Sequence, residues 1–541
     1  MTKTVSAPDE RRILIENIRV PVSAGDDAVF TEAKRRVRDC GCFGNPTQLE
    51  IHRKSIDARR KDVYFVCSVW ACVSCRSTVT DELLKPMGMR FSDSEPLELP
   101  LGEETMLGRP VIVGFGPAGI FCGLLLAECG FRPLILERGG CVDERIEAVD
   151  RFSRLGELDT TTNIQFGAGG AGTFSDGKLT TRIGDSRCRY VLERLHELGA
   201  PADILWQAKP HIGTDVLRDV IRRADERIRS LGGEIRYHAR AEKITSSSLY
   251  VGNEQIPFGT LVLAGGHSAR DLYEELIASG FSVEAKPFSV GVRVEHLQSD
   301  IDYAMYGDYA GKFGLVHADY AISHRQGDRG AYSFCMCPGG EVVAAASEEG
   351  GVVTNGMSNR GRDGRNANSA IAVSVHTSDY GGTPIGAIAY QRNLEQAAYR
   401  AGGKNYAAPC QTVGDFLNGR SGTEAKRILP TYRGGNVCYT DFHKILPRYV
   451  CSMLEAGFRQ FGKKIRGFDA DDVPMTGVET RTSAPVRILR DDTVLTALRY
   501  DRIYPCGEGA GYAGGIMSAA VDGIRVAQAI LTRYKRTGED H

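Results

Sequence analysis

The chain has 541 residues, of which 67 are Lys or Arg and 68 are Asp or Glu, so its formal net charge is −1 with neutral histidines. This balance gives no global field for holding a nucleic acid or an anionic bilayer. A content of 42% hydrophobic and 25% charged residues also excludes a generally disordered chain. Glycine is in excess, since 63 of the 541 residues are about 12% against a typical value of about 7%, and this excess predicts many tight turns and close backbone approaches.

The sequence gives no sign of export or of membrane insertion. The N-terminal residues lack the apolar core of a signal peptide, and no apolar run reaches the roughly 18 residues that a membrane helix needs. The 15 cysteines are an odd number scattered along the chain, which favours reduced thiols over a disulfide framework. We therefore expect a cytoplasmic protein with no nucleic acid or membrane partner, and the oligomeric state stays open.

The first predicted domain, residues 1–90, is a small α+β unit. Apolar residues at strand or helix spacing predict its elements. These are strands over residues 13–20, 49–53 and 62–69 and a helix over residues 26–38. A polar, proline-bearing linker is predicted over 91–106.

The motif Gly114-Phe-Gly-Pro-Ala-Gly119 follows a buried strand and opens an apolar helix. In such a turn Gly116 lets a pyrophosphate approach the backbone, Gly119 lets the helix pack on the strand, and Pro117 suits the first helical position. The helix N-terminus offers amide donors to the phosphates. A second strand ends at Glu137, at the spacing expected of a carboxylate that binds a ribose diol. These features together predict a dinucleotide site rather than an ordinary glycine turn.

Further along the chain, an amphipathic helix is predicted over 214–231, with strands over 234–238 and 260–264. Two other segments match GxGxxG. Residues 167–172 have neither a strand nor a helix beside them. Residues 509–514 lie between a strand and the helix predicted over 515–534. The residues after this second match are too few for a second complete dinucleotide fold. The second match therefore completes a domain that began earlier.

This return to the first sheet near the end of the chain favours FAD over NAD, because FAD lies extended and its ring needs a second helix N-terminus. We expect Glu508 to accept hydrogen bonds from hydroxyl groups on the ribityl or pyrophosphate side. The amides near Gly514 and Gly515 are expected to face the pyrimidine edge of the flavin. The alternative for Glu508 is a surface acid in a turn.

The region between these two parts, residues 286–489, is predicted to be an inserted β-rich domain that holds the substrate over the flavin. Arg481 is the first candidate catalytic residue, because a fixed guanidinium suits a substrate carboxylate; a surface salt bridge is the alternative. Cys337 is the second candidate, as a thiol facing the flavin or as a packing residue. Glu479, in the same segment as Arg481, completes the candidate set.

Two cysteine pairs in the first domain do not meet the spacing of a structural zinc site. Cys72 and Cys75 form a CxxC pair, and Cys40 and Cys42 are separated by one residue only. A redox dithiol and half of a zinc site remain alternatives to idle thiols, which we favour. We predict no metal site.

Several motifs together carry a family resemblance over nearly the whole chain. They are Gly114–Gly119, Glu137–Gly139, Gly167–Lys178, His211–Asp215, Leu263–Asp271, Cys335–Gly340, Gly477–Thr482 and Gly507–Glu508. On these the chain resembles the bacterial FAD-dependent dehydrogenases, a family of NAD(P)/FAD-dependent oxidoreductases with a glutathione-reductase-type FAD fold.

The resemblance implies that FAD is bound by the first and last motifs, that residues 169–178 pass beside the flavin, and that Gly265 approaches the cofactor. It also implies that the N-terminal domain, marked by Arg53–Arg60, is a ferredoxin-like appendage. The Cys72/Cys75 pair departs from what we expect of the family.

The sequence therefore predicts an α/β protein whose Rossmann-like FAD-binding domain, with three layers (ββα), is completed by the C-terminus. Its parts are the N-terminal ferredoxin-like domain (1–90), the linker (91–106), the first part of the FAD-binding domain (107–285), the inserted mixed α+β or β-rich domain (286–489) and the C-terminal part (490–541).

The predicted function is an FAD-dependent oxidoreductase, a dehydrogenase or reductase with non-covalent FAD. It moves hydride or electrons between a donor, NAD(P)H being one candidate, and a small organic substrate. An FAD monooxygenase or oxidase is the alternative among enzymes, and a flavin-binding redox sensor is the alternative from another class. The predicted cofactor-binding residues are Gly114, Gly116, Pro117, Ala118, Gly119, Glu137, Arg138, Gly169, Gly170, Lys178, Ala241, Gly265, Gly507, Glu508, Gly514 and Gly515.

Overall fold

A computed structural model describes residues 9–75, 79–92 and 97–536 of the chain, which form two compact units. The first unit comprises the described part of Met1–Glu98 together with Pro201–Pro210 and Asp302–His317. The second unit comprises the other described residues. Each unit is taken by itself below.

The first unit is a four-stranded antiparallel sheet with one long helix. Its strands lie in the order β2-β3-β1-β4. Its elements are β1 (Asp9–Pro21), α1 (Gly25–Cys40), β2 (Gln48–Asp57), β3 (Tyr64–Cys75), α2 (Asp81–Leu84) and β4 (Met89–Phe91). Every second residue of β3 is buried, because one face of the sheet packs on the apolar side of α1. This βαββαβ order is the ferredoxin-like arrangement, although α2 is a single turn.

Four details of the first unit differ from the sequence prediction. The strand predicted over 62–69 continues to Cys75, so Cys72 and Cys75 lie inside β3, and a fourth strand follows. The segment 201–210, which we placed in a later domain, groups with this unit because the Lys54 N–H donates to the Trp206 carbonyl and the Ala208 N–H donates to the Lys54 carbonyl. The segment 302–317 groups with it as well.

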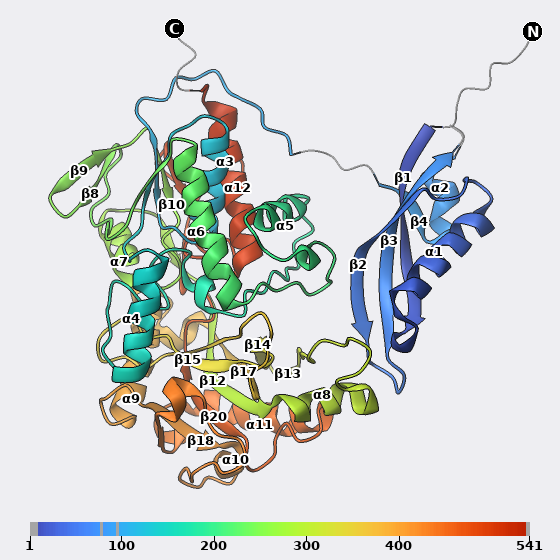
Figure 1. Cartoon of the computed structure of the whole chain (residues 1–541). Helices are drawn as coiled ribbons and strands as arrows, with labels where there is room; N and C mark the ends of the chain where they lie inside the picture. Colours follow the sequence, from blue (N-terminus) through green and yellow to red (C-terminus); the bar gives the residue numbers. More distant parts are fainter. Residues whose placement is uncertain (1–8, 76–78, 93–96, 537–541) are drawn as a thin grey trace, which may run out of the picture. The chain divides into compact units, whose positions relative to one another are not determined.

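A five-stranded parallel sheet forms the centre of one half of the second unit (Figure 1). Its strands lie in the order β22-β10-β5-β6-β7. They are β5 (Pro110–Val113), β6 (Leu134–Leu136), β7 (Glu234–Arg236), β10 (Thr260–Leu263) and β22 (Ile503–Pro505). Every residue of β5, β6, β10 and β22 is buried, as expected of a parallel sheet that is covered on both faces. Since β22 comes almost at the end of the chain, the C-terminal segment completes this sheet.

The two faces of the parallel sheet are covered differently. On one face α3 packs against Ile135, through Gly123, and α6 and α12 lie beside α3 (Figure 1). On the other face Val111 and Leu261 pack in a cluster with the hairpin of β8 and β9. The helices and hairpin strands are α3 (Pro117–Glu128), α4 (Val142–Leu155), α5 (Arg187–Glu197), α6 (Thr214–Ser230), β8 (Ser248–Val251), β9 (Glu254–Pro257), α7 (Arg270–Ala278) and α12 (Ile516–Arg533).

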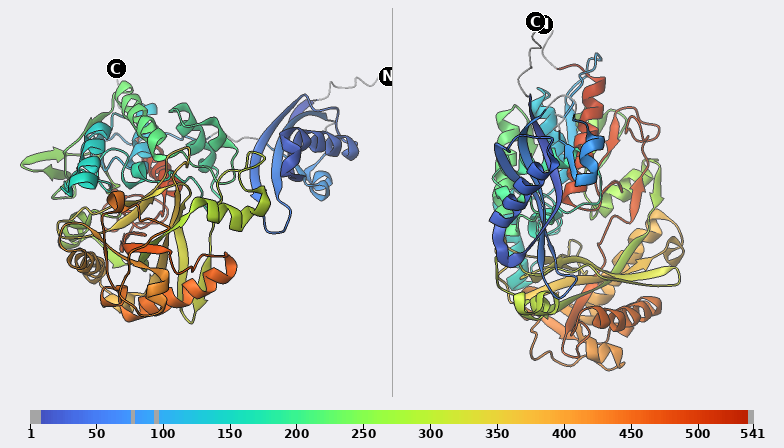
Figure 2. Two further views of the ribbon diagram at one scale, coloured as in Figure 1. Left: turned by 60° about the horizontal axis from the view of Figure 1, so that its bottom comes forward. Right: turned by 90° about the vertical axis from the view of Figure 1, so that its right-hand side faces the viewer.

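The other half of the second unit, which we call the cap, is built on a seven-stranded mixed sheet (Figure 2). The strand order is β13-β14-β17-β12-β20-β18-β19, and α11 packs on β13, β14 and β17. The elements are β12 (Phe288–Leu297), β13 (Ser323–Gln326), β14 (Arg329–Cys337), β15 (Glu341–Ala344), β16 (Thr354–Met357), β17 (Asn366–Val375), α9 (Pro384–Ala401), β18 (Ala408–Thr412), α10 (Val413–Leu417), β19 (Val437–Tyr439), α11 (Arg448–Lys464) and β20 (Pro474–Glu479). Helix α8 (Gln298–Tyr306) leads from β12 into the segment that groups with the first unit.

The chain enters and leaves the cap side by side. The strand before the cap, β11 (Val283–Ala285), pairs antiparallel with the strand after it, β21 (Val486–Ile488). Among the described residues, no helix combines the length and apolar character needed to cross a bilayer.

Candidate functional site

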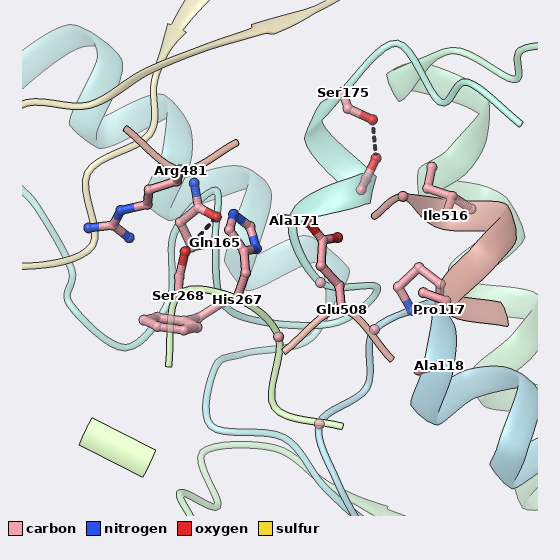
Figure 3. A pocket seen from close by; sticks show the side chains of 18 of the residues that line it. Pro117, Ala118, Gln165, Ala171, Ser175, His267, Ser268, Arg481, Glu508 and Ile516 are labelled. Atoms are coloured by element: carbon pink, nitrogen blue, oxygen red, sulfur yellow. Dashed lines mark hydrogen bonds between the residues drawn. The ribbon is translucent and has the colours of Figure 1, made fainter. Parts of the chain in front are cut away.

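A deep cavity lies where the carboxyl ends of β5, β6 and β10 meet the cap strands β14, β16 and β20. It encloses about 1530 Å³ of empty space, its open mouth included. Figure 3 shows Glu508, Pro117 and Ile516 on one side of the cavity, and Arg481, Gln165 and Ser268 on the other. Residues far apart in the sequence are therefore brought to one space.

The glycine turn between β5 and α3 has the local geometry that the motif predicts. Gly114 has φ +101°, and a Cβ there would lie 2.3 Å from the Ala264 carbonyl oxygen, so no other residue fits without a shift. A Cβ on Gly116 would lie 3.7 Å from the Cα of Gly170, so these two backbones approach closely. Gly116 also caps α3 without a side-chain hydrogen bond. The first-turn amides of α3 are thus left for an anion.

Glu137 is held by three backbone amides. Its Oε1 accepts hydrogen bonds from the N–H groups of Gly139 (3.0 Å) and Gly167 (2.9 Å), and its Oε2 accepts one from Phe115 (2.9 Å). The side chain is 5% exposed and lines the cavity. The carboxylate therefore joins three separate turns, and Oε2 keeps acceptor capacity for a ligand.

The segment over residues 163–168, which leads into the loop 167–178, is held by an arginine that the sequence did not reveal. The guanidinium of Arg145, which is 0% exposed, donates to the carbonyls of Asn163 (2.8 Å), Ile164 (2.7 Å) and Ala168 (2.6 Å). Burial without a paired carboxylate lowers the pKa of Arg145 to about 9. Arg145 lies on the amphipathic helix α4, where an arginine is normally expected to face solvent. The sequence pattern of this helix therefore does not indicate that Arg145 is buried.

Glu508 is the predicted C-terminal acid, and it lines the cavity next to α12. Its carboxylate has no hydrogen bond or ion pair to the described residues, and burial raises its pKa to about 7. Gly515 caps α12 without a side-chain bond, and a Cβ on Gly514 or Gly515 would meet no atom within 4 Å. The Gly514 N–H, which was predicted to face the flavin, instead donates to Ser518 Oγ at 3.1 Å. A second uncapped helix N-terminus therefore opens into the same cavity.

The other predicted cofactor residues are also near this space. The cavity is lined by Pro117, Ala118, Arg138, Gly170, Lys178, Ala241 and Gly265, whereas Gly119, which lies in α3, and Gly169 and Gly507 are not part of its lining. Arg138 is paired with Asp271 at 2.7 Å.

The role predicted for Arg481 does not fit its contacts. Its Nε and one terminal nitrogen donate to Glu395 at 3.1 and 2.9 Å, and the other terminal nitrogen donates to Ser347. Glu395 is shared with Arg270 at 2.6 Å. Burial opposes ionisation of Glu395, but Arg270 and Arg481 together hold its pKa well below the usual range. Arg481 is therefore part of a buried ion-pair network that lines the cavity, and its guanidinium is committed to protein partners.

Glu479 and Cys337 are likewise occupied. Arg293 donates to both carboxylate oxygens of Glu479, at 3.0 and 2.7 Å. Cys337 is 2% exposed, its Sγ donates to the Cys335 carbonyl at 3.3 Å, and burial raises its pKa. The cysteine that is exposed to the cavity is Cys335. It faces a space enclosed by protein atoms, and burial raises its pKa to about 12.

Two further cavity residues were missed in the sequence. His267 lines the cavity, and burial lowers its pKa to about 4, so the imidazole is neutral. Asn355 of β16 also lines it. His267 lies within the motif Leu263–Asp271, in which only Gly265 was given a role, and Asn355 lies in none of the motifs. Among the described residues, no group of three or more His, Cys, Asp or Glu side chains is arranged to hold a metal ion.

Comparisons with known proteins relate the chain to a family and to one long relative. Residues 287–482 match the family described as "FAD-dependent protein, C-terminal domain-like". A protein of Clostridium beijerinckii, described as an uncharacterized protein, is 45% identical over 498 residues, which cover 90% of this chain and 93% of the relative. The chain belongs to the same family as this relative, and its residues 287–482 belong to the family of FAD-dependent C-terminal domains.

The residues matched by the family model include the sheet of the cap and end shortly before β21. Among solved structures, CtdE in complex with FAD is 10% identical, with 79% of this chain and 84% of that chain covered and a TM-score of 0.33. The halogenase PltM is 12% identical, with 79% and 71% covered and a TM-score of 0.36. Glycine oxidase from Geobacillus kaustophilus is 12% identical, with 79% and 95% covered and a TM-score of 0.35. Similarities of this size carry no argument about the reaction.

Proposed function

We propose that the protein is an FAD-dependent oxidoreductase that transfers hydride or electrons between a donor and a small organic substrate held under the cap. NAD(P)H is one candidate donor. The observation that supports this most directly is the shared cavity, because one space is lined by the glycine turn, by Glu508 and by the cap strands β14, β16 and β20.

The residues around the cavity fit FAD. The first-turn amides of α3 would hold its pyrophosphate, Glu137 a ribose hydroxyl through Oε2, and Glu508 the hydroxyls between pyrophosphate and ring. The amides at the start of α12 would face the polar edge of the flavin. When bound, FAD supplies an acceptor and donor of two electrons, which side chains alone lack.

The residues of this chain would position the cofactor and the substrate and exclude water from the cavity. Main-chain donors and two helix N-termini bind anionic and polar edges, and the cap strands cover the opposite wall. The Arg270–Glu395–Arg481 network joins α7 to α9 and to the segment after β20, so it fixes the cap on the parallel-sheet half. A substrate placed between these walls is held next to the ring position without free water.

The test is anaerobic titration of the purified protein with NADH, NADPH and a panel of small organic substrates, with flavin absorbance recorded. Bleaching by one of these donors, followed by recovery with an acceptor, is the expected result. A protein whose bound flavin is reduced by none of them would favour the redox-sensor alternative. Oxygen consumption coupled to peroxide or to a hydroxylated product would favour the oxidase or monooxygenase alternative.

A further inference from the structure

The charged side chains that line the cavity fall into two groups. In the first group every charge is engaged by protein: Glu137 by backbone amides, Arg138 by Asp271, Asp176 by Arg362, Glu479 by Arg293 and Arg481 by Glu395. The second group is Lys178 and Glu508, whose side chains have no hydrogen bond or ion pair to any described residue. Glu508 is already placed on the cofactor side by its position between α3 and α12 (Figure 3).

Lys178 belongs to the part of the cavity that the cap closes. It is half-buried, at the end of the loop that follows Phe174, and its ammonium acts electrostatically on the Asp176 carboxylate and on the thiols of Cys335 and Cys337 in β14. This corner is thus made by a lysine from the parallel-sheet half and by a strand from the cap.

The strand β14 is distorted at this corner. Its pairing with β17 shifts register between Phe334 and Cys337, and Cys335 has φ +44°, a left-handed conformation that is strained for a residue with a Cβ. In a regular strand Cys335 and Cys337 would face the same side. Both cysteines line the cavity, but Cys335 is exposed whereas Cys337 is buried, and bulges are common next to active sites, where they re-aim a side chain.

The polar groups left in this corner are donors. Asn355 accepts through Oδ1 from the Gly356 N–H and from Arg293, and its Nδ2 has no acceptor among the described residues. Arg293 also donates to the Cys335 carbonyl and to Glu479, so it pairs that carboxylate and links Cys335 to Asn355. The other carboxylate of this corner, Asp176, is paired with Arg362 at 2.7 Å. One free ammonium and one free amide N–H₂ therefore remain beside an exposed thiol.

We propose that Lys178 and Asn355 bind the carboxylate of the substrate, so that the protein acts on a small organic acid. The inference rests on the proposed function, because it places the substrate in the same cavity as FAD. A single ammonium matches one carboxylate charge, and the amide adds a second donor for a bidentate contact. A phosphate dianion would keep one charge unpaired there. This assigns to Lys178 the anchoring role that we predicted for Arg481.

The test is a titration of the holoprotein with benzoate, pyruvate and malonate, and with the neutral benzamide, pyruvamide and malonamide. Binding is followed by the shift in the flavin absorption spectrum and, independently of flavin, by calorimetry. We expect at least one acid to bind saturably and its amide to bind at least about tenfold more weakly. Inorganic phosphate is titrated in parallel and is expected to bind more weakly than the best acid.

Four variants assign the effect to the corner. Lys178→Met should weaken binding of the acid at least about tenfold, and Lys178→Arg should restore most of it. Asn355→Asp keeps the Oδ1 acceptor but replaces the N–H₂ donor with a negatively charged oxygen, so it should weaken binding of the acid as well. Lys463 is exposed at the end of α11, away from the cavity, and serves as the control. The variant Lys463→Met should bind the acid as tightly as the unaltered protein does.

Three results would overturn the inference: no acid binds, the amides or phosphate bind as tightly as the acids, or Lys178→Met binds the acid unchanged with its FAD content intact. Protein that is isolated without FAD and does not take it up would count against the proposed function instead. The calorimetric titration would still decide whether the acid binds at Lys178.

Discussion

Glu137 gives the sharpest test of how the dinucleotide site is built. If its only task were to bind a ribose hydroxyl, Glu137→Ala would weaken FAD binding by about 1–3 kcal/mol and leave the free protein unchanged. In the structure the carboxylate accepts three buried N–H groups, from Phe115, Gly139 and Gly167. The alanine variant leaves these donors without an acceptor, at about 1–3 kcal/mol each, or about 3–9 kcal/mol if the costs were additive.

We therefore expect Glu137→Ala to loosen the three turns even without FAD. Hydrogen exchange of the apo-protein, resolved by peptide, measures this directly. At the lower limit of about 3 kcal/mol, exchange of the Phe115, Gly139 and Gly167 amides should be roughly 100-fold faster. Glu137→Gln, which keeps one acceptor oxygen, should lie between.

Glu508→Gln is the matched control, because Glu508 has no protein partner among the described residues. It should weaken FAD binding and leave amide exchange in the three turns unchanged. Unaltered protection of these amides in Glu137→Ala would refute the structural role of Glu137, whatever the effect on FAD.

Two further predictions concern the charged groups of the cavity. Arg481→Met breaks a buried ion pair, so it should destabilise the protein by about 3–5 kcal/mol, nearer the lower limit because Arg270 still pairs with Glu395. Thermal unfolding checks this, and an unchanged stability with a lost turnover would return Arg481 to the role of substrate anchor. For Glu508, burial raises the pKa from its ordinary value of 4.5 to about 7. Between these pH values the folded state holds a proton that the unfolded state has lost, so apo-protein stability should fall as the pH rises from about 4.5 to about 7. Denaturant titrations across this range should show that slope, and a Glu508→Gln variant with the same slope would contradict the assignment to Glu508.

Local features of the site could be predicted from the sequence, and pairings across the chain could not. The turn at Gly114–Gly119 is encoded by a strand, glycines and a helix within a few residues, and its geometry follows from those residues alone. Arg481 finds its partner Glu395 86 residues away on another element, and nothing in either segment announces that pairing. Beside the bulge in β14, Cys335 is exposed and Cys337 is buried although both line the cavity, and the spacing of the two cysteines does not predict this difference.

The most direct measurement of the central claim is the identity and amount of the cofactor that acid releases from the purified protein. We predict FAD, released without a covalent link and in about one equivalent per chain, because one glycine turn and one C-terminal helix together form a single site. Release of FMN or NAD, or an apo-protein that takes up no FAD on titration, would contradict the claim.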